Sequence, residues 1–288
     1  MSAPVSNNQS TRQATQKVVL VTGASSGIGQ ACAEHLARNG WRVFGTSRSA
    51  SSSASASPAA NGSFELIQMD VEDEASVRQG VDSVLARAGR LDAVVNNAGI
   101  SIMGSVEDTS IEEAKAQLET NFFGVLRVCR ATLPILRRQG GGHIVNISSL
   151  AGIIGLPFSG LYSASKFALE GVSESLRMEC RQFGVRVVLV EPGDFRTNIT
   201  TRRRTVQAAA TNDAYRAAFD HCKQKQDQDE ANARTPESVA RLVARILNDP
   251  HPRTRYSVGM FTQTMIVPLK RILPQRLFEW MARQAFGM

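Results

Sequence analysis

The sequence lacks the features that mark metal proteins, secreted proteins and membrane-spanning proteins. Its four cysteines, Cys32, Cys129, Cys180 and Cys222, lie far apart and show no CxxC spacing. No metal site is therefore expected, and free thiols in a reducing cytoplasm are the preferred interpretation. No apolar run approaches the roughly 18 residues that a membrane-spanning helix needs. Residues 1–16 are polar, without the apolar core of a secretory signal, and are predicted to form a flexible tail.

Acidic residues are scarce at the C-terminal end. The 288-residue chain has a formal net charge of +7, and from Arg241 onward eight basic residues face only Asp249 and Glu279. Such an excess can indicate nucleic acid, an anionic membrane or an acidic ligand. No recognition helix, zinc finger or aromatic RNA-binding pattern accompanies it, which argues against nucleic acid. Peripheral membrane contact through the basic C-terminus stays open.

Short β-branched runs alternate with helical patterns along a chain whose composition, with 42% hydrophobic residues, is typical of a globular protein. Strands are predicted at 18–21, 41–45, 64–68, 93–95, 143–147, 185–190 and 255–259. Helices are predicted at 30–39, 75–88, 111–138, 161–183, 236–247 and 274–286. This alternation predicts an α/β fold of one domain, a doubly wound parallel sheet with helices on both faces.

Three stretches depart from this alternation. Residues 17–260 are predicted to form the sheet domain, and residues 261–288 an amphipathic C-terminal extension. Within the domain, the Ser- and Ala-rich stretch 49–63 is predicted to be a flexible loop. The polar, helix-prone stretch 199–234 suits an insertion that covers a substrate site as a lid.

A glycine-rich turn, TGASSGIG at residues 22–29, follows the first predicted strand and opens the first helix. Glycines let the backbone approach a pyrophosphate, and a helix N-terminus offers free N–H groups to it. A tight turn without a ligand is the alternative, but the strand-to-helix context favours a dinucleotide. The expected cofactor-binding residues here are Gly23, Ser25, Ser26, Gly27, Ile28 and Gly29.

The end of the second strand bears on which dinucleotide binds. An NAD site usually offers an acidic residue to the ribose 2′-OH, whereas a 2′-phosphate attracts arginine. The sequence has Arg48 at this point and no acidic residue. NADP(H) is therefore the preferred cofactor and NAD(H) the alternative, because an arginine here could also be an ordinary solvated surface residue.

The most specific cluster is YSASK, residues 162–166, with Ser149 thirteen residues before the tyrosine. Positions i and i+4 share one face of a helix, so Tyr162 and Lys166 can point into the same pocket. Lowering a tyrosine pKa from near 10 by about 3 units needs about 4 kcal/mol, more than an exposed ion pair supplies. We therefore expect Lys166 to act on Tyr162 in a partly closed site, helped by the positive charge of an oxidised nicotinamide.

Taken together, these motifs resemble the classical short-chain dehydrogenase/reductase family, whose members have a Rossmann fold. The resemblance covers about residues 17–249, and the C-terminal extension is similar to that of hydroxysteroid- and retinol-type members. It rests on the glycine turn, Asp70-Val71, Asn96-Asn97-Ala98-Gly99, Asn121, Ser149, YSASK, Pro192-Gly193 and Thr197. One departure is Ser26, where NADP-preferring members often have a basic residue.

The resemblance implies a role for each matching position. It implies catalysis by Asn121, Ser149, Tyr162 and Lys166, with Tyr162 as the proton donor in reduction. It also implies cofactor contacts from the turn, Arg48, Asp70, Val71, Asn97, Ala98, Gly99, Tyr162, Lys166, Pro192, Gly193 and Thr197. A homodimer or homotetramer, built on the helices that start near Ile111 and Leu161, is expected as well.

Apolar residues flank these positions: Ile100, Ile102, Leu150, Ile153, Ile154, Leu156, Phe158 and Phe195. Apolar walls predict a bulky apolar substrate, such as a steroid, retinoid or lipid-like carbonyl, with Ser149, Ile100, Leu150 and Phe195 as its contacts. The same residues could equally be core. The alternatives are a reductase of smaller ketones or 3-oxoacyl compounds, and a dinucleotide-binding regulatory protein without turnover.

Overall fold

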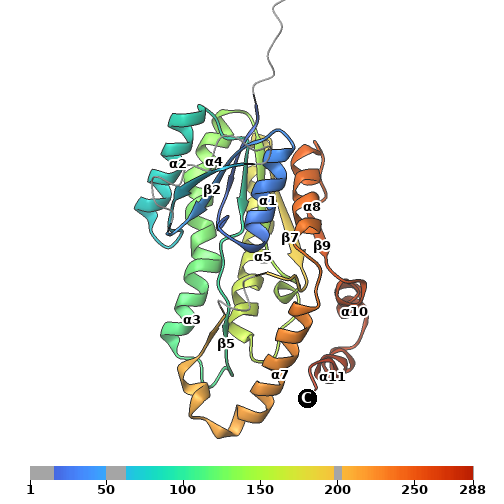
Figure 1. Ribbon diagram of the computed structural model, residues 1–288. Coiled ribbons are helices and arrows are strands. Elements are labelled where there is room, and N and C mark those ends of the chain that lie inside the picture. Colours follow the sequence, from blue (N-terminus) through green and yellow to red (C-terminus); the bar gives the residue numbers. More distant parts are fainter. Residues whose placement is uncertain (1–15, 50–62, 198–202, 288) are drawn as a thin grey trace, which may run out of the picture.

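Parallel strands form a central sheet in the computed structural model, which describes residues 16–49, 63–197 and 203–287 (Figure 1). The seven strands are β1 Val18–Val21, β2 Arg42–Ser47, β3 Glu65–Gln68, β4 Ala93–Asn96, β6 Gly142–Ile147, β7 Val185–Pro192 and β9 Arg255–Val258. Their order is β3-β2-β1-β4-β6-β7-β9, and every pair is parallel. The order reverses beside β1, so the predicted doubly wound fold is confirmed.

Helices cover both faces of the sheet because successive side chains of a strand point to opposite faces. On one face, Val18 and Leu20 pack with α2 Glu74–Ala88, α4 Gly124–Arg138 and α5 Gly160–Cys180. On the other face, Val19 and Val21 pack with α1 Gly27–Arg38 and α8 Glu237–Asn248. All four β1 side chains are buried, as expected for a central parallel strand.

The predicted helix 111–138 is wrong as a single helix. It consists of α3 Ile111–Leu118, a π-helical turn Glu119–Phe123 and α4. A capping box between Ser110 and Glu113 starts α3. The π-turn adds a residue to the helical repeat and turns Asn121 into the interior, where it is fully buried.

Two short strands were not predicted, because two residues show no periodicity. They are β5 Ile102–Met103 and β8 Arg204–Thr205, which pair in parallel beyond the edge of the main sheet. Beside them lies α7 Asp213–Ala231, which makes up most of the predicted insertion (Figure 1). Predictions for residues 1–15, 50–62 and 198–202 fall outside the described residues.

The C-terminal extension folds as three helices rather than one. They are α9 Phe261–Thr264, α10 Ile266–Ile272 and α11 Gln275–Ala285, and the last turns back towards α7 (Figure 1). Cys222 on α7 contacts the Phe286 carbonyl at 3.7 Å, which places the chain end against this helix. In the described ranges no helix is long and apolar enough to cross a bilayer.

Candidate active site

The glycine turn is fixed by contacts from the end of β4. Gly23 has φ +65°, and a Cβ there would lie 2.9 Å from the Ala98 Cα. The Asn97 amide donates to the Thr22 carbonyl at 2.9 Å, and the Ala98 N–H donates to the Thr22 hydroxyl at 3.0 Å. Asn97 and Ala98 therefore hold the turn in shape, in addition to lining the cavity beside it.

A cavity of about 500 Å³, the glycine-turn cavity, opens at the N-terminus of α1. Most predicted cofactor residues line it: Gly23, Ser25, Ser26, Gly27, Ile28, Arg48, Asp70, Val71, Asn97, Ala98, Gly99 and Thr197. Gly29 does not, because it packs against the Gly23 carbonyl, which a Cβ there would approach to 2.4 Å. The cavity, the glycines and the helix N-terminus together fit a dinucleotide.

Eight residues of this cavity were not predicted from the sequence: Thr46, Ser47, Ser49, Met69, Glu72, Ser101, Thr120 and Arg204. Arg204 arrives from β8, which no local pattern places beside the glycine turn. Glu72 lies 3.9 Å from Arg48, so the guanidinium faces a carboxylate as well as the open cavity.

A second cavity of about 400 Å³, the Tyr162 cavity, adjoins the first. Six residues line both: Ile28, Asn97, Gly99, Ile100, Ser101 and Thr197. Ser149, Tyr162, Lys166, Pro192 and Gly193 line the second. The structure thus brings the predicted reacting residues to the carboxyl ends of the strands, where a dinucleotide in the first cavity would reach them.

Tyr162 lies in the first turn of α5, and Lys166 follows one turn later. The Lys166 ammonium lies 5.9 Å from the Tyr162 ring centroid and donates to the Ile147 carbonyl at 2.9 Å. Burial lowers the pKa of Lys166 to about 8. The predicted shared pocket is confirmed, and the lysine is 6% exposed.

The expected fall in the Tyr162 pKa is not found in the protein alone. Burial raises this pKa, and the carboxylates of Glu230 and Asp194 raise it further, while a hydrogen bond with Ser149 acts in the opposite direction. The phenol therefore stays protonated at neutral pH. Both carboxylates lie far from Tyr162 in the sequence, so the YSASK spacing gave no indication of them.

Asn121 lines neither cavity. Its amide donates to the Ile100 carbonyl and to the Ser165 hydroxyl, both at 3.1 Å, and its carbonyl accepts from the Ile100 N–H at 2.9 Å. The side chain therefore ties the segment after β4 to α5. It acts on the cavities through Ile100 and the helix that carries Tyr162.

The walls of the Tyr162 cavity are only partly apolar. Ile100, Leu150, Ile154, Leu156 and Phe195 line it as expected, whereas Ile102, Ile153 and Phe158 do not. The extension adds Ile266, Ala285 and Phe286. Charged residues form another part of the lining: Asp194, Arg203, Lys225, Asp229 and Glu230. Four of them belong to the predicted insertion, which therefore contributes a charged face, mostly from α7, to the cavity.

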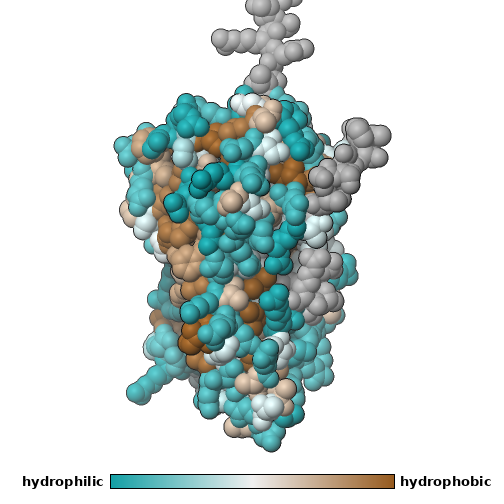
Figure 2. Space-filling model, turned by 90° about the vertical axis from the view of Figure 1, so that its left-hand side faces the viewer, coloured by the Kyte–Doolittle hydropathy of each residue, from teal (hydrophilic) through white to brown (hydrophobic). Residues whose placement is uncertain are grey.

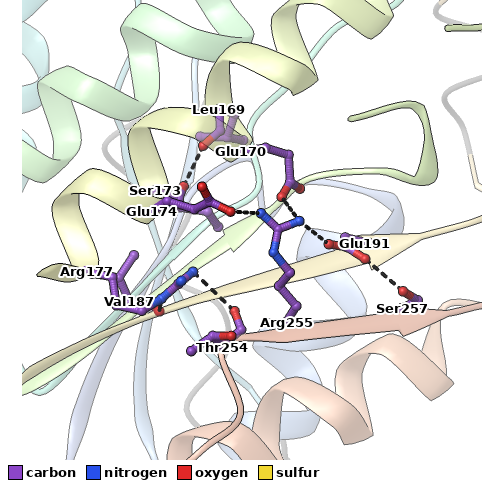
Figure 3. A network of polar contacts seen from close by, with 11 residues as sticks. Leu169, Glu170, Ser173, Glu174, Arg177, Val187, Glu191, Thr254, Arg255 and Ser257 are labelled. Atoms are coloured by element: carbon purple, nitrogen blue, oxygen red, sulfur yellow. Dashed lines mark hydrogen bonds and ion pairs between the residues drawn. The ribbon is translucent and has the colours of Figure 1, made fainter. Parts of the chain in front are cut away.

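A largely buried ionic network centres on Arg255 (Figure 3). Arg255 on β9 contacts Glu170 at 2.7 Å, Glu174 at 2.6 Å and Glu191 at 3.1 Å, and Ser257 donates to Glu191 at 2.7 Å. Burial raises the pKa of Glu170 to about 7. The network joins α5 to β7 and β9, one turn along the helix from Lys166.

Metal chemistry finds no support among the residues that the structure describes. No group of three His, Cys, Asp or Glu side chains there could hold an ion. All four cysteines are buried free thiols, and burial raises the pKa of Cys32 to about 12. These thiols are packing residues.

Comparison with known proteins agrees with this geometry. The short chain dehydrogenase family model matches residues 17–208. A 3-ketodihydrosphingosine reductase of Bacteroides thetaiotaomicron is 37% identical over 93% of this chain and 97% of its own length. A short-chain dehydrogenase structure from Streptomyces avermitilis has 34% identity and a TM-score of 0.78, covering 92% of this chain and 96% of its own.

A third similar protein was solved with a cofactor. It is a short chain dehydrogenase/reductase from Burkholderia phymatum in complex with NAD, with 26% identity and a TM-score of 0.76. The alignment covers 89% of this chain and 92% of that one. The chain belongs to the short-chain dehydrogenase/reductase family of oxidoreductases.

Proposed function

We propose that this protein is an NADP(H)-dependent oxidoreductase that transfers a hydride to or from a carbonyl or secondary alcohol carbon of a long-chain, lipid-like substrate. One observation carries the proposal. The glycine-turn cavity, which fits a dinucleotide, opens into a cavity where Ser149, Tyr162 and Lys166 meet an apolar wall. The similarity to a 3-ketodihydrosphingosine reductase supports a lipid-like substrate.

Each reacting residue of the Tyr162 cavity has a separate role in reduction. A bound nicotinamide supplies the hydride, and Tyr162 donates the proton to the carbonyl oxygen. The raised pKa of Tyr162 keeps its phenol protonated, which is the state a general acid needs. Ser149 polarises the carbonyl oxygen. Lys166, which donates to the Ile147 carbonyl, would stabilise the phenolate that remains and hold the ribose of a bound cofactor. Asn121 positions the helix and loop around them.

Arg48 supports NADP(H) over NAD(H). Its guanidinium lines the glycine-turn cavity with 57% of its side chain exposed, so it is free to turn towards a 2′-phosphate. We expect Arg48→Ala to weaken NADPH binding roughly 10-fold to 100-fold and NADH binding less than about twofold, since charge-assisted contacts contribute about 1.5–3 kcal/mol. Fluorescence titration with both cofactors measures this.

Arg204 provides the matched control for Arg48. It is a second arginine of the same cavity, and Arg204→Ala has no reason to separate the two cofactors. If Arg48→Ala weakened NADPH and NADH equally, Arg48 would not read the 2′-phosphate.

A panel of carbonyl compounds tests the function itself. We expect kcat/KM with NADPH to rise with chain length along a series of aliphatic ketones, because each buried CH₂ contributes about 0.8 kcal/mol. A steroid ketone and a short polar ketone complete the panel, and cofactor oxidation is followed spectroscopically. A preference for the short polar ketone would favour the smaller-substrate alternative. Cofactor binding without turnover of any member would favour a regulatory protein.

Assembly and membrane contact stay predictions. Exposed hydrophobic side chains on the helices from Ile111 to Cys180, among them Ile111, Phe123, Phe167 and Met178, support a homo-oligomer, whose molar mass in solution can be measured. Figure 2 shows hydrophobic patches on the side of the molecule where α2 and α3 lie.

The extension exposes Phe261, Ile272, Leu277, Trp280 and Met281 among basic residues, which supports contact with an anionic membrane. Cosedimentation with anionic vesicles tests this contact.

A further inference from the structure

The Tyr162 cavity contains one carboxylate that forms no ion pair with the described residues. Of the three carboxylates in its lining, Asp229 pairs with Lys225 at 3.1 Å and Glu230 pairs with Arg203. Asp194 has only the side-chain amide of Gln263, which donates to Oδ2 at 2.5 Å. Among the described residues, the carboxylates of Asp229 and Glu230 thus have ion-pair partners, whereas Asp194 feels Arg203 only at longer range.

Asp194 lies close to the reacting groups. It follows Pro192-Gly193 directly after β7, and its charge acts on the Tyr162 hydroxyl, whose pKa it raises. Burial and the neighbouring carboxylates Glu230 and Asp229 raise the pKa of Asp194 to about 6, against the opposing effects of the Gln263 hydrogen bond and the charge of Arg203. The group is thus ionised at neutral pH in a setting where a bound cation would stabilise it.

The other residues of the cavity indicate which kind of substrate would carry such a cation. Leu150, Ile154, Leu156, Ile266 and Phe286 offer an apolar surface that suits an alkyl chain, and Asp194 is the carboxylate of the lining that forms no ion pair with the described residues. We propose that Asp194 is a specificity-determining residue that binds a protonated amine next to the reacting carbonyl, so that the preferred substrates are long-chain α-amino ketones. This inference rests on the proposed function and narrows its substrate class.

A purely structural role for Asp194 makes a different prediction. Gln263 contacts Asp194 twice, because its Oε1 also accepts from the Asp194 N–H at 3.2 Å, and these bonds join α9 to the loop after β7. Asp194→Asn keeps an oxygen that can accept from Gln263 and removes the charge. Gln263→Ala removes the connection and keeps the charge. The two variants therefore separate recognition from docking of the extension.

The experiment compares a long-chain α-amino ketone with the same ketone without the amine, with NADPH as cofactor. We expect the wild-type protein to prefer the amino ketone in kcat/KM about 10-fold to 100-fold, the range of a charge-assisted contact. In Asp194→Asn this preference falls to less than about threefold, because kcat/KM falls more for the amino ketone than for the neutral ketone. Gln263→Ala retains the preference.

The pH dependence supplies a second readout. The preference should be full above the Asp194 pKa of about 6 and fall as the pH drops through it, because the amine stays protonated while the carboxylate loses its charge. Equal use of both ketones by the wild type would overturn the inference and leave the proposed function standing. Equal losses for both ketones in Asp194→Asn would show a structural role and overturn it as well.

If neither ketone is reduced, the result counts against the proposed function. Binding of an amine to Asp194 can still be measured in that case. Calorimetry on the NADP(H)-loaded protein compares a long-chain amine with the alcohol of equal length. Tighter binding of the amine that Asp194→Asn abolishes supports the role of Asp194. Equal binding of amine and alcohol contradicts it.

Discussion

Replacing Tyr162 by phenylalanine should lower kcat with a long-chain ketone and NADPH by about 100-fold to 10,000-fold, because a positioned general acid contributes a factor of this size. The substitution deletes one hydroxyl and almost no volume. The affinity for NADPH, measured by titration, and the melting temperature should therefore change little. The raised pKa of Tyr162 keeps its phenol protonated in the protein alone, which is the state that a proton donor needs in reduction.

Tyr215 provides the matched control for Tyr162→Phe. It is one of three tyrosines in the chain, lies on α7 outside both cavities and donates to Glu107 at 2.8 Å. Tyr215→Phe removes the same atom and should leave kcat within about twofold. If Tyr162→Phe retained kcat within about threefold of the wild type, another group would have to donate the proton.

Replacing Arg255 by methionine should lower the free energy of unfolding by about 3–5 kcal/mol, the usual loss when one partner of a buried ion pair is removed. The substitution leaves the carboxylates of Glu170 and Glu191, whose side chains are 8% and 2% exposed, without their shared cation. Urea denaturation measures the loss. Because Glu170 and Lys166 share a face of α5, kcat should fall as well.

The loss in Arg255→Met should depend on pH. Glu170 already has a pKa raised from 4.5 to about 7, and removal of the arginine raises it further. In the wild type Glu170 is already half protonated near pH 7, so the added loss from this group develops above about pH 7 and shrinks as the pH falls through that value. The loss should thus be larger at about pH 8 than at about pH 5.

Arg38→Met is the control for Arg255→Met, because Arg38 pairs with Glu34 on the exposed face of α1 and should contribute less than about 1 kcal/mol. A pH-independent loss of similar size in Arg255→Met would contradict the account of the buried network.

Local sequence patterns predicted the features that depend only on residues within one strand-turn-helix unit. The glycine turn after β1 and the i, i+4 pair of Tyr162 and Lys166 are placed as their spacing indicated. Both depend on a helix that begins directly after the motif, so nearby residues determine them. The alternation of strands and helices predicted the sheet for the same reason.

Features that depend on distant segments were missed. The π-turn at Glu119–Phe123 leaves the apolar pattern of a long helix almost unchanged, so nothing marked it. The charged lining from α7 and the position of Arg204 arise because segments more than fifty residues from Tyr162 or from the glycine turn fold over the cavities. For the same reason the carboxylates of Glu230 and Asp194, which help to raise the Tyr162 pKa in the protein alone, were not predicted.

Transfer of isotope tests the central claim most directly. The protein is incubated with a long-chain ketone and NADPH that carries deuterium at its transferable position, and the alcohol product is examined by mass spectrometry. The account predicts a product with one deuterium on the carbinol carbon, formed by the wild type and hardly at all by Tyr162→Phe. An unlabelled product, or no alcohol from any long-chain ketone, would contradict it.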